Sequence, residues 1–154
     1  MRFLLVDRIT QVESDRHIEG TKNVAMSEDY LEWHFPEQPI LPGVLLLEAS
    51  AQLASWLVSE ASDFAQRFLL DRVLSARYYH FAVPGDQVRL VVRHVEGADD
   101  GRRRFEAESH IGDKRTALLE FEGPLLPIEH EEDRRHTRHA YGVLSGQGPL
   151  EGGR

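Results

Sequence analysis

The segment from Gly43 to Glu60 constrains the fold more than any other part of the chain. It is rich in Leu and Ala, contains no Pro, and is apolar around most of its circumference. A helix with this pattern must be buried on nearly all sides, because each apolar face left in water costs free energy. The sequence therefore predicts one long helix at the centre of the protein.

The few polar residues of this predicted helix lie on one face. They follow one another at spacings of four, three and four residues: Glu48, Gln52, Ser55 and Ser59. Side chains three and four residues apart are neighbours on a helix surface. The pattern therefore predicts one polar stripe along an otherwise buried helix.

Much of the remaining chain has the pattern of β-strands. Short runs rich in Leu, Val and Ile, or alternating between apolar and polar residues, are typical of strands. We predict strands over Phe3–Val12, His17–Ala25, Gln87–Arg93, Arg104–Ile111 and Thr116–Phe121. Strands, one long helix and then more strands predict an α+β fold, with an antiparallel sheet wrapped around one long central buried helix.

The chain is predicted to form one folded domain over residues 1–127. A length of 154 residues is that of one ordinary domain. Beyond Ile128 the sequence alternates charges with His130, His136 and His139 and then becomes Gly-rich. We interpret residues 128–154 as a polar, flexible tail and its histidines as solvated groups. We therefore expect no metal site and no cofactor.

Composition excludes several classes of function. A formal net charge of -8 argues against a nucleic-acid partner, because phosphate binding needs an excess of Lys and Arg. The absence of cysteine excludes disulfides and thiolate metal sites. The apolar opening ends at Asp7, too early for a signal peptide or a membrane span. We therefore expect a cytoplasmic protein without membrane insertion.

A Pro-rich loop places a histidine directly before the central helix. Pro36, Pro39 and Pro42 restrict the backbone of this loop, which carries His34, and Gly43 opens the helix. Rigidity of this kind favours a preorganised site, with Glu48 in the second turn of the helix.

Elimination of water from a 3-hydroxyacyl thioester needs a base, an acid and a group that stabilises a developing oxyanion. A neutral His34 can accept the α-proton. Desolvation on an apolar helix favours the protonated form of Glu48, which can then donate to the leaving hydroxyl. The free N–H groups around Gly43 can bind the thioester oxygen. Gln52, one turn after Glu48, is placed to orient its carboxyl.

The run HFPEQPILPGVLLLEASAQ, from His34 to Gln52, closely resembles the active-site segment of bacterial (3R)-hydroxyacyl-acyl-carrier-protein dehydratases, the FabZ-like family of the hot-dog superfamily. LLVDR at Leu4–Arg8 and VPGD at Val83–Asp86 resemble two further segments of that family, so the likeness covers roughly residues 3–123. It implies a hot-dog fold and a dehydratase (a hydro-lyase) of fatty-acid or related acyl biosynthesis.

The resemblance also implies how the site is assembled. In the family the histidine and the helix carboxylate meet across a homodimer, so His34 of one subunit would act with Glu48 of the other. Gly43 would bind the thioester oxygen, and the acyl chain would run along the buried helix. Whether dimers assemble further, into a trimer of dimers, stays open. The substrate would be carried by acyl carrier protein.

Three positions depart from the family pattern. Trp33 stands where Gly is common, Gln38 where a second His is common, and Ser50 where Met is common. None of them removes a catalytic group, but Trp33 beside His34 can reshape the substrate entrance. Glu48, where isomerising relatives carry Asp, favours the simple dehydratase branch.

Two other functions stay open on the sequence alone. A hot-dog acyl-CoA thioesterase needs a positioned water and a carboxylate but no base on the loop, and a non-catalytic acyl-chain binding module needs neither His34 nor Glu48. For an acidic carrier protein, the acidic chain needs a local basic face. We expect Arg72, Arg77 and Arg102–Arg104 to gather near the substrate entrance.

Overall fold

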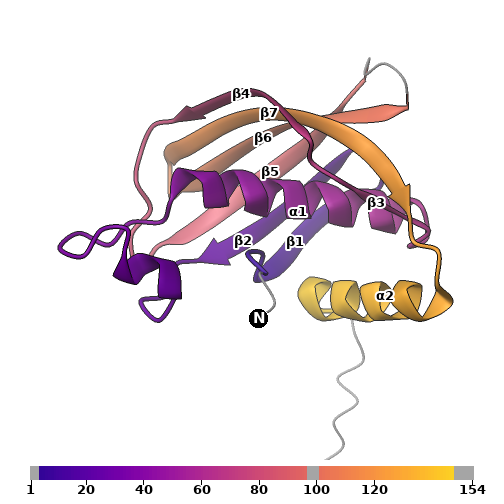
Figure 1. The fold of residues 1–154 in the computed structure, drawn as a ribbon, viewed down its shortest axis with the longest axis horizontal. Coiled ribbons are helices and arrows are strands. Elements are labelled where there is room, and N and C mark those ends of the chain that lie inside the picture. The colour runs from indigo at the N-terminus through magenta and orange to yellow at the C-terminus, as the bar shows by residue number, and fades with distance from the viewer. Residues whose placement is uncertain (1–3, 97–100, 148–154) are drawn as a thin grey trace, which may run out of the picture.

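The computed structural model describes residues 4–96 and 101–147. It contains an antiparallel sheet, one long helix inside the curve of that sheet, and a second helix that follows the last strand (Figure 1). The elements are β1 (Arg8–Glu13), β2 (His17–Asn23), the 3-10 helix η1 (Asp29–Glu32), α1 (Gly43–Ala61), β3 (Gln66–Phe68), β4 (Arg72–Tyr78), β5 (Gln87–Val95), β6 (Arg102–Ile111), β7 (Lys114–Pro127) and α2 (Glu131–Ser145).

The sheet is built around the long strand β7. The strand order is β1-β2-β5-β6-β7-β3, and β4 pairs with β7 on the side where β3 pairs. One edge of β7 pairs along its length with β6, while the other edge is shared by β4 and β3. The sheet curls over α1 (Figure 1), which is the hot-dog arrangement predicted from the sequence.

The core lies between α1 and the concave face of the sheet. Leu53 and Leu57 of α1 are buried against strands that include β2, β3 and β5. Val88, Leu90 and Val92 alternate along β5 and are fully buried. This alternation is what a strand with one face in the core requires. The predicted central helix and the predicted strand face are both confirmed.

Two strands have no counterpart in the sequence prediction. β4 is exposed at almost every position and β3 is three residues long, so neither shows the alternation that marks a half-buried strand. Of the predicted strand Phe3–Val12, Phe3 lies outside the described residues. Within them the strand begins at Arg8, because the backbone N–H of Leu5 donates to the side chain of Gln52 on α1 and not to a neighbouring strand.

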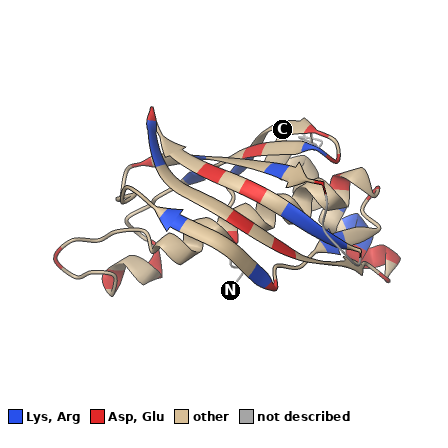
Figure 2. Cartoon of the chain, turned by 90° about the horizontal axis from the view of Figure 1, so that it is seen from above, with Lys and Arg blue, Asp and Glu red and all other residues tan. Residues whose placement is uncertain are grey.

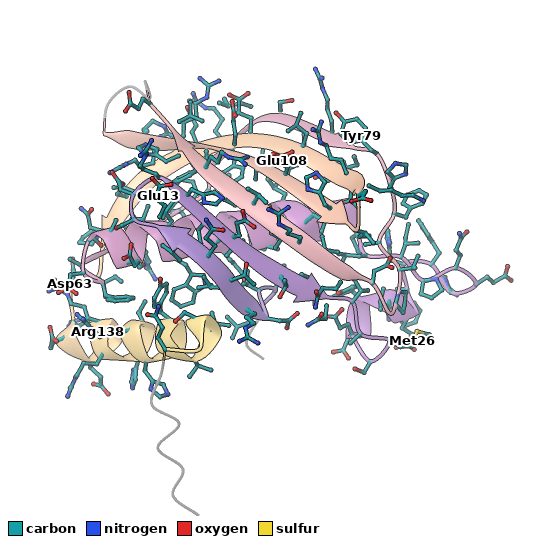
Figure 3. The ribbon with its side chains drawn as sticks, turned by 180° about the vertical axis from the view of Figure 1, so that it is seen from behind. Glu13, Met26, Asp63, Tyr79, Glu108 and Arg138 are labelled. Carbon is teal, nitrogen blue, oxygen red and sulfur yellow. The ribbon has the colours of Figure 1, made fainter. Side chains whose placement is uncertain are left out.

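The prediction of an unstructured segment after Ile128 is wrong for Glu131–Ser145, which form α2. Three acidic residues lie in its first turn, at the positive end of the helix dipole. Tyr141 is buried against Phe64, with ring centroids 5.5 Å apart. Arg138 lies beside Asp63, with 3.0 Å between guanidinium nitrogen and carboxylate oxygen (Figure 3). A single aromatic anchor and local charges stabilise this otherwise polar helix. Residues 148–154 of the predicted tail lie outside the described part of the chain.

None of the helices that the structure describes is long and apolar enough to cross a membrane.

Candidate active site

His34 is held by the loop that carries it. Its Nδ1 lies 3.1 Å from the carbonyl oxygen of Ile40, and the backbone N–H of Ile40 donates to the carbonyl of His34 at 2.9 Å. The imidazole also stacks on Phe35, with ring centroids 4.3 Å apart. Because Nδ1 donates to a carbonyl in this geometry, Nε2 is the nitrogen with the available lone pair. The loop thus presents a half-buried imidazole in the tautomer that a base requires.

A buried ion pair anchors the start of this loop to β2. Lys22 is 3% exposed, and its Nζ donates to the backbone carbonyl of Asn23 at 2.7 Å and to the carboxylate of Glu28. The other carboxylate oxygen of Glu28 accepts from the hydroxyl of Tyr30 and from the backbone N–H of Ala25. Burial and the hydrogen bond to Glu28 raise the pKa of Tyr30, so this phenol stays a donor. The segment that leads to His34 is thereby fixed.

Replacing Lys22 with Ala is expected to lower the free energy of unfolding by about 3 kcal/mol, because Glu28 would lose its buried charge partner. Urea denaturation followed by circular dichroism measures the change. Lys114→Ala, at an exposed position in the β6–β7 turn region, is the control and should change stability by less than about 0.5 kcal/mol. Equal effects of the two substitutions would contradict an anchoring role for Lys22.

The start of α1 is available to bind an oxygen atom. Within the described chain, no side chain caps the helix at Pro42 and no acidic residue lies in its first turn. The ring of Tyr78 covers Gly43 so closely that a Cβ at Gly43 would lie 2.9 Å from Tyr78 Cδ1. Unpaired N–H groups and the positive end of the helix dipole favour an anionic oxygen at this point. A side chain at position 43 would therefore force the Tyr78 ring to move.

Glu48 and Gln52 form the predicted pair on one face of α1. Gln52 Nε2 donates to Glu48 Oε1 at 2.9 Å, and Gln52 Oε1 accepts from the backbone N–H of Leu5 at 3.0 Å. The Leu5 N–H fixes which end of the amide is the acceptor, so the NH₂ group must face the carboxyl. The half-buried Glu48 is thus oriented by a residue that is itself held by the N-terminal segment.

The two candidate catalytic groups are held separately within one chain. Among the described residues, no hydrogen bond or ion pair joins His34 to Glu48; His34 contacts Ile40, whereas Glu48 contacts Gln52. In the same part of the chain, no group of three or more His, Cys, Asp or Glu is placed to hold a metal ion. The arrangement contains a base, a carboxyl group and a helix N-terminus, which are the groups that general acid–base catalysis with a stabilised oxyanion requires.

The arginines that we expected near the substrate entrance do not gather there. Arg72 and Arg104 both lie opposite Glu122 of β7, whereas Tyr78, which covers Gly43, lies opposite Ala117. Five residues of strand separate the two places by about 17 Å. Figure 2 shows basic and acidic residues interleaved along the strands. The ion pairs are Arg72–Glu122, Arg102–Asp71, Arg103–Asp15 and Arg104–Glu120.

Of the expected group, only Arg77 lies at the Gly43 end of the sheet, next to Tyr78. It makes no ion pair within the described residues. The expectation fails for the other four, each of which makes an ion pair with a carboxylate of a neighbouring strand or loop.

The structure adds Leu5, Lys22, Glu28 and Tyr78 to the residues that shape the site. Lys22 and Glu28 contact each other and are six residues apart. Leu5 and Tyr78 act through contacts between segments far apart in the sequence, Leu5 with Gln52 and Tyr78 with Gly43. The sequence gives no signal for these contacts, because β4 itself has no strand pattern and Leu5 acts through its backbone.

Comparison with known proteins identifies relatives over most of the chain. Residues 1–120 match the FabA-like domain family. The 3-hydroxyacyl-[acyl-carrier-protein] dehydratase FabZ of Symbiobacterium thermophilum is 42% identical over 122 residues, covering 77% of this chain and 85% of the relative. The FabZ of Cupriavidus taiwanensis is 38% identical over 116 residues, covering 73% of this chain and 76% of the relative.

Solved structures show the same fold at low sequence identity. A Streptococcus mutans protein bound to acetyl-CoA has a TM-score of 0.63 at 15% identity, covering 82% of this chain and 94% of that protein. A chain of the dehydratase heterocomplex ApeI:P of Xenorhabdus doucetiae has a TM-score of 0.56 at 16% identity, and the match covers 75% of this chain and 91% of that chain. These likenesses concern the fold alone. From the match over residues 1–120 and the two FabZ relatives, the chain belongs to the FabA-like domain family.

Proposed function

We propose that this protein is a 3-hydroxyacyl-[acyl-carrier-protein] dehydratase, which converts (3R)-3-hydroxyacyl thioesters to trans-2-enoyl thioesters in fatty-acid or related acyl biosynthesis. The observation that carries the proposal is the oriented pair of functional groups at the start of α1. The loop holds His34 with Nε2 as its basic nitrogen, and Gln52 orients the carboxyl of Glu48. A relative named for this activity is 42% identical to the chain over 122 aligned residues.

The geometry supports an elimination of water in which each proton that is transferred has a named donor or acceptor. His34 Nε2 removes the α-proton, and the electron pair moves onto the thioester oxygen at the N–H groups around Gly43. As the C2–C3 double bond forms, the C3–O bond breaks and the Glu48 carboxylic acid protonates the leaving hydroxide. The products are the enoyl thioester and water. His34 is left protonated and Glu48 ionised, so one proton transfer through solvent resets the site.

The proposed enzyme is a homodimer in which His34 of one subunit serves Glu48 of the other. The separation of the two groups within one chain supports this, as does the edge strand β4. In the described chain β4 pairs with β7 alone, which leaves its other edge unpaired. Tyr78 is 46% exposed, Phe81 is 71% exposed, and the exposed apolar residues around them are Val73, Leu74, Tyr79 and Val83. An exposed apolar edge strand is a template for pairing with another chain.

Replacing Leu74 on this edge with Asp is expected to convert the dimer to a monomer, because a carboxylate would be buried without a partner at the interface. Sedimentation at micromolar protein measures the loss as a halving of the molecular mass. Val143 is 63% exposed on α2, and Val143→Asp is the matched control, which should leave the mass unchanged. A dimer that survives Leu74→Asp would place the interface elsewhere.

The proposed reaction is tested with the purified protein and trans-2-enoyl thioesters on acyl carrier protein and on a small thiol. Hydration of the conjugated double bond lowers its ultraviolet absorbance, and a thiol reagent separately reports thioester cleavage. We expect hydration without release of thiol, with the higher kcat/KM for the carrier-bound chain. Thiol release without hydration would identify a thioesterase. Binding of the thioester with neither reaction would identify an acyl-chain binding module.

A further inference from the structure

A pocket of about 770 Å³ lies between α1 and α2, at the ends of β3 and β7. Its walls include Ser55 and Ser59 of α1, Arg67 of β3, and His136 and Thr137 of α2. This volume is within the range of small-molecule sites. α2 lies beyond residue 120, where the match to the FabA-like family ends. The pocket is therefore formed by the family fold together with a helix outside the matched region.

The pocket adjoins the candidate catalytic carboxyl. Gln52, which donates to Glu48, is also one of the residues that line the pocket. Along the same stripe of α1, Ser55 lies about 10 Å and Ser59 about 16 Å beyond Glu48, at a rise of 1.5 Å per residue. If the C3 atom of the substrate lies at Glu48, an acyl chain that follows this polar stripe has its distal end in the pocket.

The lining of this pocket is mixed, with more polar or charged residues than apolar ones; the apolar ones are Leu4, Trp56, Leu126, Pro127 and Ile128. Ser59 Oγ donates to the carbonyl of Gln66 at 2.9 Å, and Thr137 Oγ1 donates to the carbonyl of Asp133 at 2.8 Å. Ser55 is half-buried, and its hydroxyl makes no hydrogen bond to the described residues. A methyl terminus beside Ser55 would remove water from this hydroxyl without replacing the hydrogen bonds of that water, which costs free energy.

The charges of the lining favour a neutral polar group. The guanidinium of Arg67 makes no ion pair within the described chain, but Glu129 and Asp133 line the same pocket and offset its charge. A carboxylate-terminated chain would meet these two acids, and an ammonium-terminated chain would meet Arg67. A hydroxyl can both donate to an acid or carbonyl and accept from Arg67 or Ser55.

We propose that this pocket binds the distal end of the substrate acyl chain and selects chains that end in an uncharged hydrogen-bonding group, a hydroxyl above all. The proposal rests on the dehydratase function proposed above and names its substrate class. Ser55 is the specificity-determining residue. α2 supplies the outer wall, which the packing of Tyr141 against Phe64 holds in place.

The experiment compares hydration of two trans-2-enoyl thioesters of equal chain length, one ending in methyl and the other in hydroxyl. The expected result is a kcat/KM about tenfold higher for the hydroxyl-ended chain, the value of one buried hydrogen bond. Ser55→Ala should remove this preference, by lowering kcat/KM for the hydroxyl-ended chain and raising it for the methyl-ended chain. Ser145→Ala, at the far end of α2, is the control and should keep the preference.

The outcomes separate this inference from the function on which it rests. Efficient hydration of both chains without preference, or with preference for methyl, overturns the polar pocket and leaves the dehydratase intact. A preference that survives both Ser55→Ala and Arg67→Ala assigns selectivity to another part of the molecule and overturns the role of this pocket. Hydration of neither chain overturns the dehydratase, and the inference fails with it.

Discussion

Replacing His34 with Ala is expected to lower kcat/KM for enoyl-thioester hydration by about 10²- to 10⁴-fold, the usual contribution of a positioned general base. The imidazole is the group on the Pro-rich loop that can take the α-proton, because its hydrogen bond to Ile40 leaves Nε2 available. KM should change little, since the thioester oxygen is bound at Gly43. The ultraviolet assay of the enoyl group measures both constants.

The chain offers a matched control in His94. Its Nδ1 lies 3.1 Å from the carbonyl oxygen of Asp15, the same distance as His34 Nδ1 from Ile40, but His94 lies opposite Phe105, at the Arg104 end of the sheet. His94→Ala therefore removes the same kind of contact far from Gly43 and should leave kcat unchanged. Full activity in His34→Ala, or an equal loss in His94→Ala, would contradict the assignment of the base.

The sequence predicts those parts of the fold in which the residue types themselves indicate which positions are buried. α1 is apolar around most of its circumference, so burial stabilises it, and the alternation of β5 identifies the face that packs on it. β4 is different, because both of its faces carry apolar residues that stay exposed in a single chain. Its role depends on the pairing with β7, which no local pattern encodes.

The same distinction applies to the candidate site. The contact between Glu48 and Gln52 follows from their spacing of four residues on one helix, and the structure contains it. The hydrogen bond from Leu5 to Gln52, by contrast, joins two segments 47 residues apart. The prediction of an arginine cluster was wrong for a related reason. Counting charges along the chain does not show that these arginines form ion pairs with carboxylates of other strands and loops. α2 was missed because the helix is polar, with Tyr141 as its one buried residue.

Replacing Glu48 with Gln should reduce hydration about as strongly as His34→Ala, since an amide cannot protonate the leaving hydroxide. Gln at this position keeps an oxygen that can accept from Gln52 Nε2, so the fold and the orientation of the side chain should survive. Each homodimeric variant is then nearly inactive, and the two together test where the site is assembled.

A mixed dimer of His34→Ala and Glu48→Gln chains should recover about half of the wild-type activity, because a two-fold axis creates two equivalent sites. If each site takes His34 from one subunit and Glu48 from the other, one site of the mixed dimer receives both intact groups and the other receives both substitutions. Co-expression with two different tags and sequential affinity purification isolates the mixed dimer. Two differently tagged His34→Ala chains form the control, which should stay inactive. Sites contained within single chains would each lack one group, so a mixed dimer as inactive as its parents would rule out the shared site.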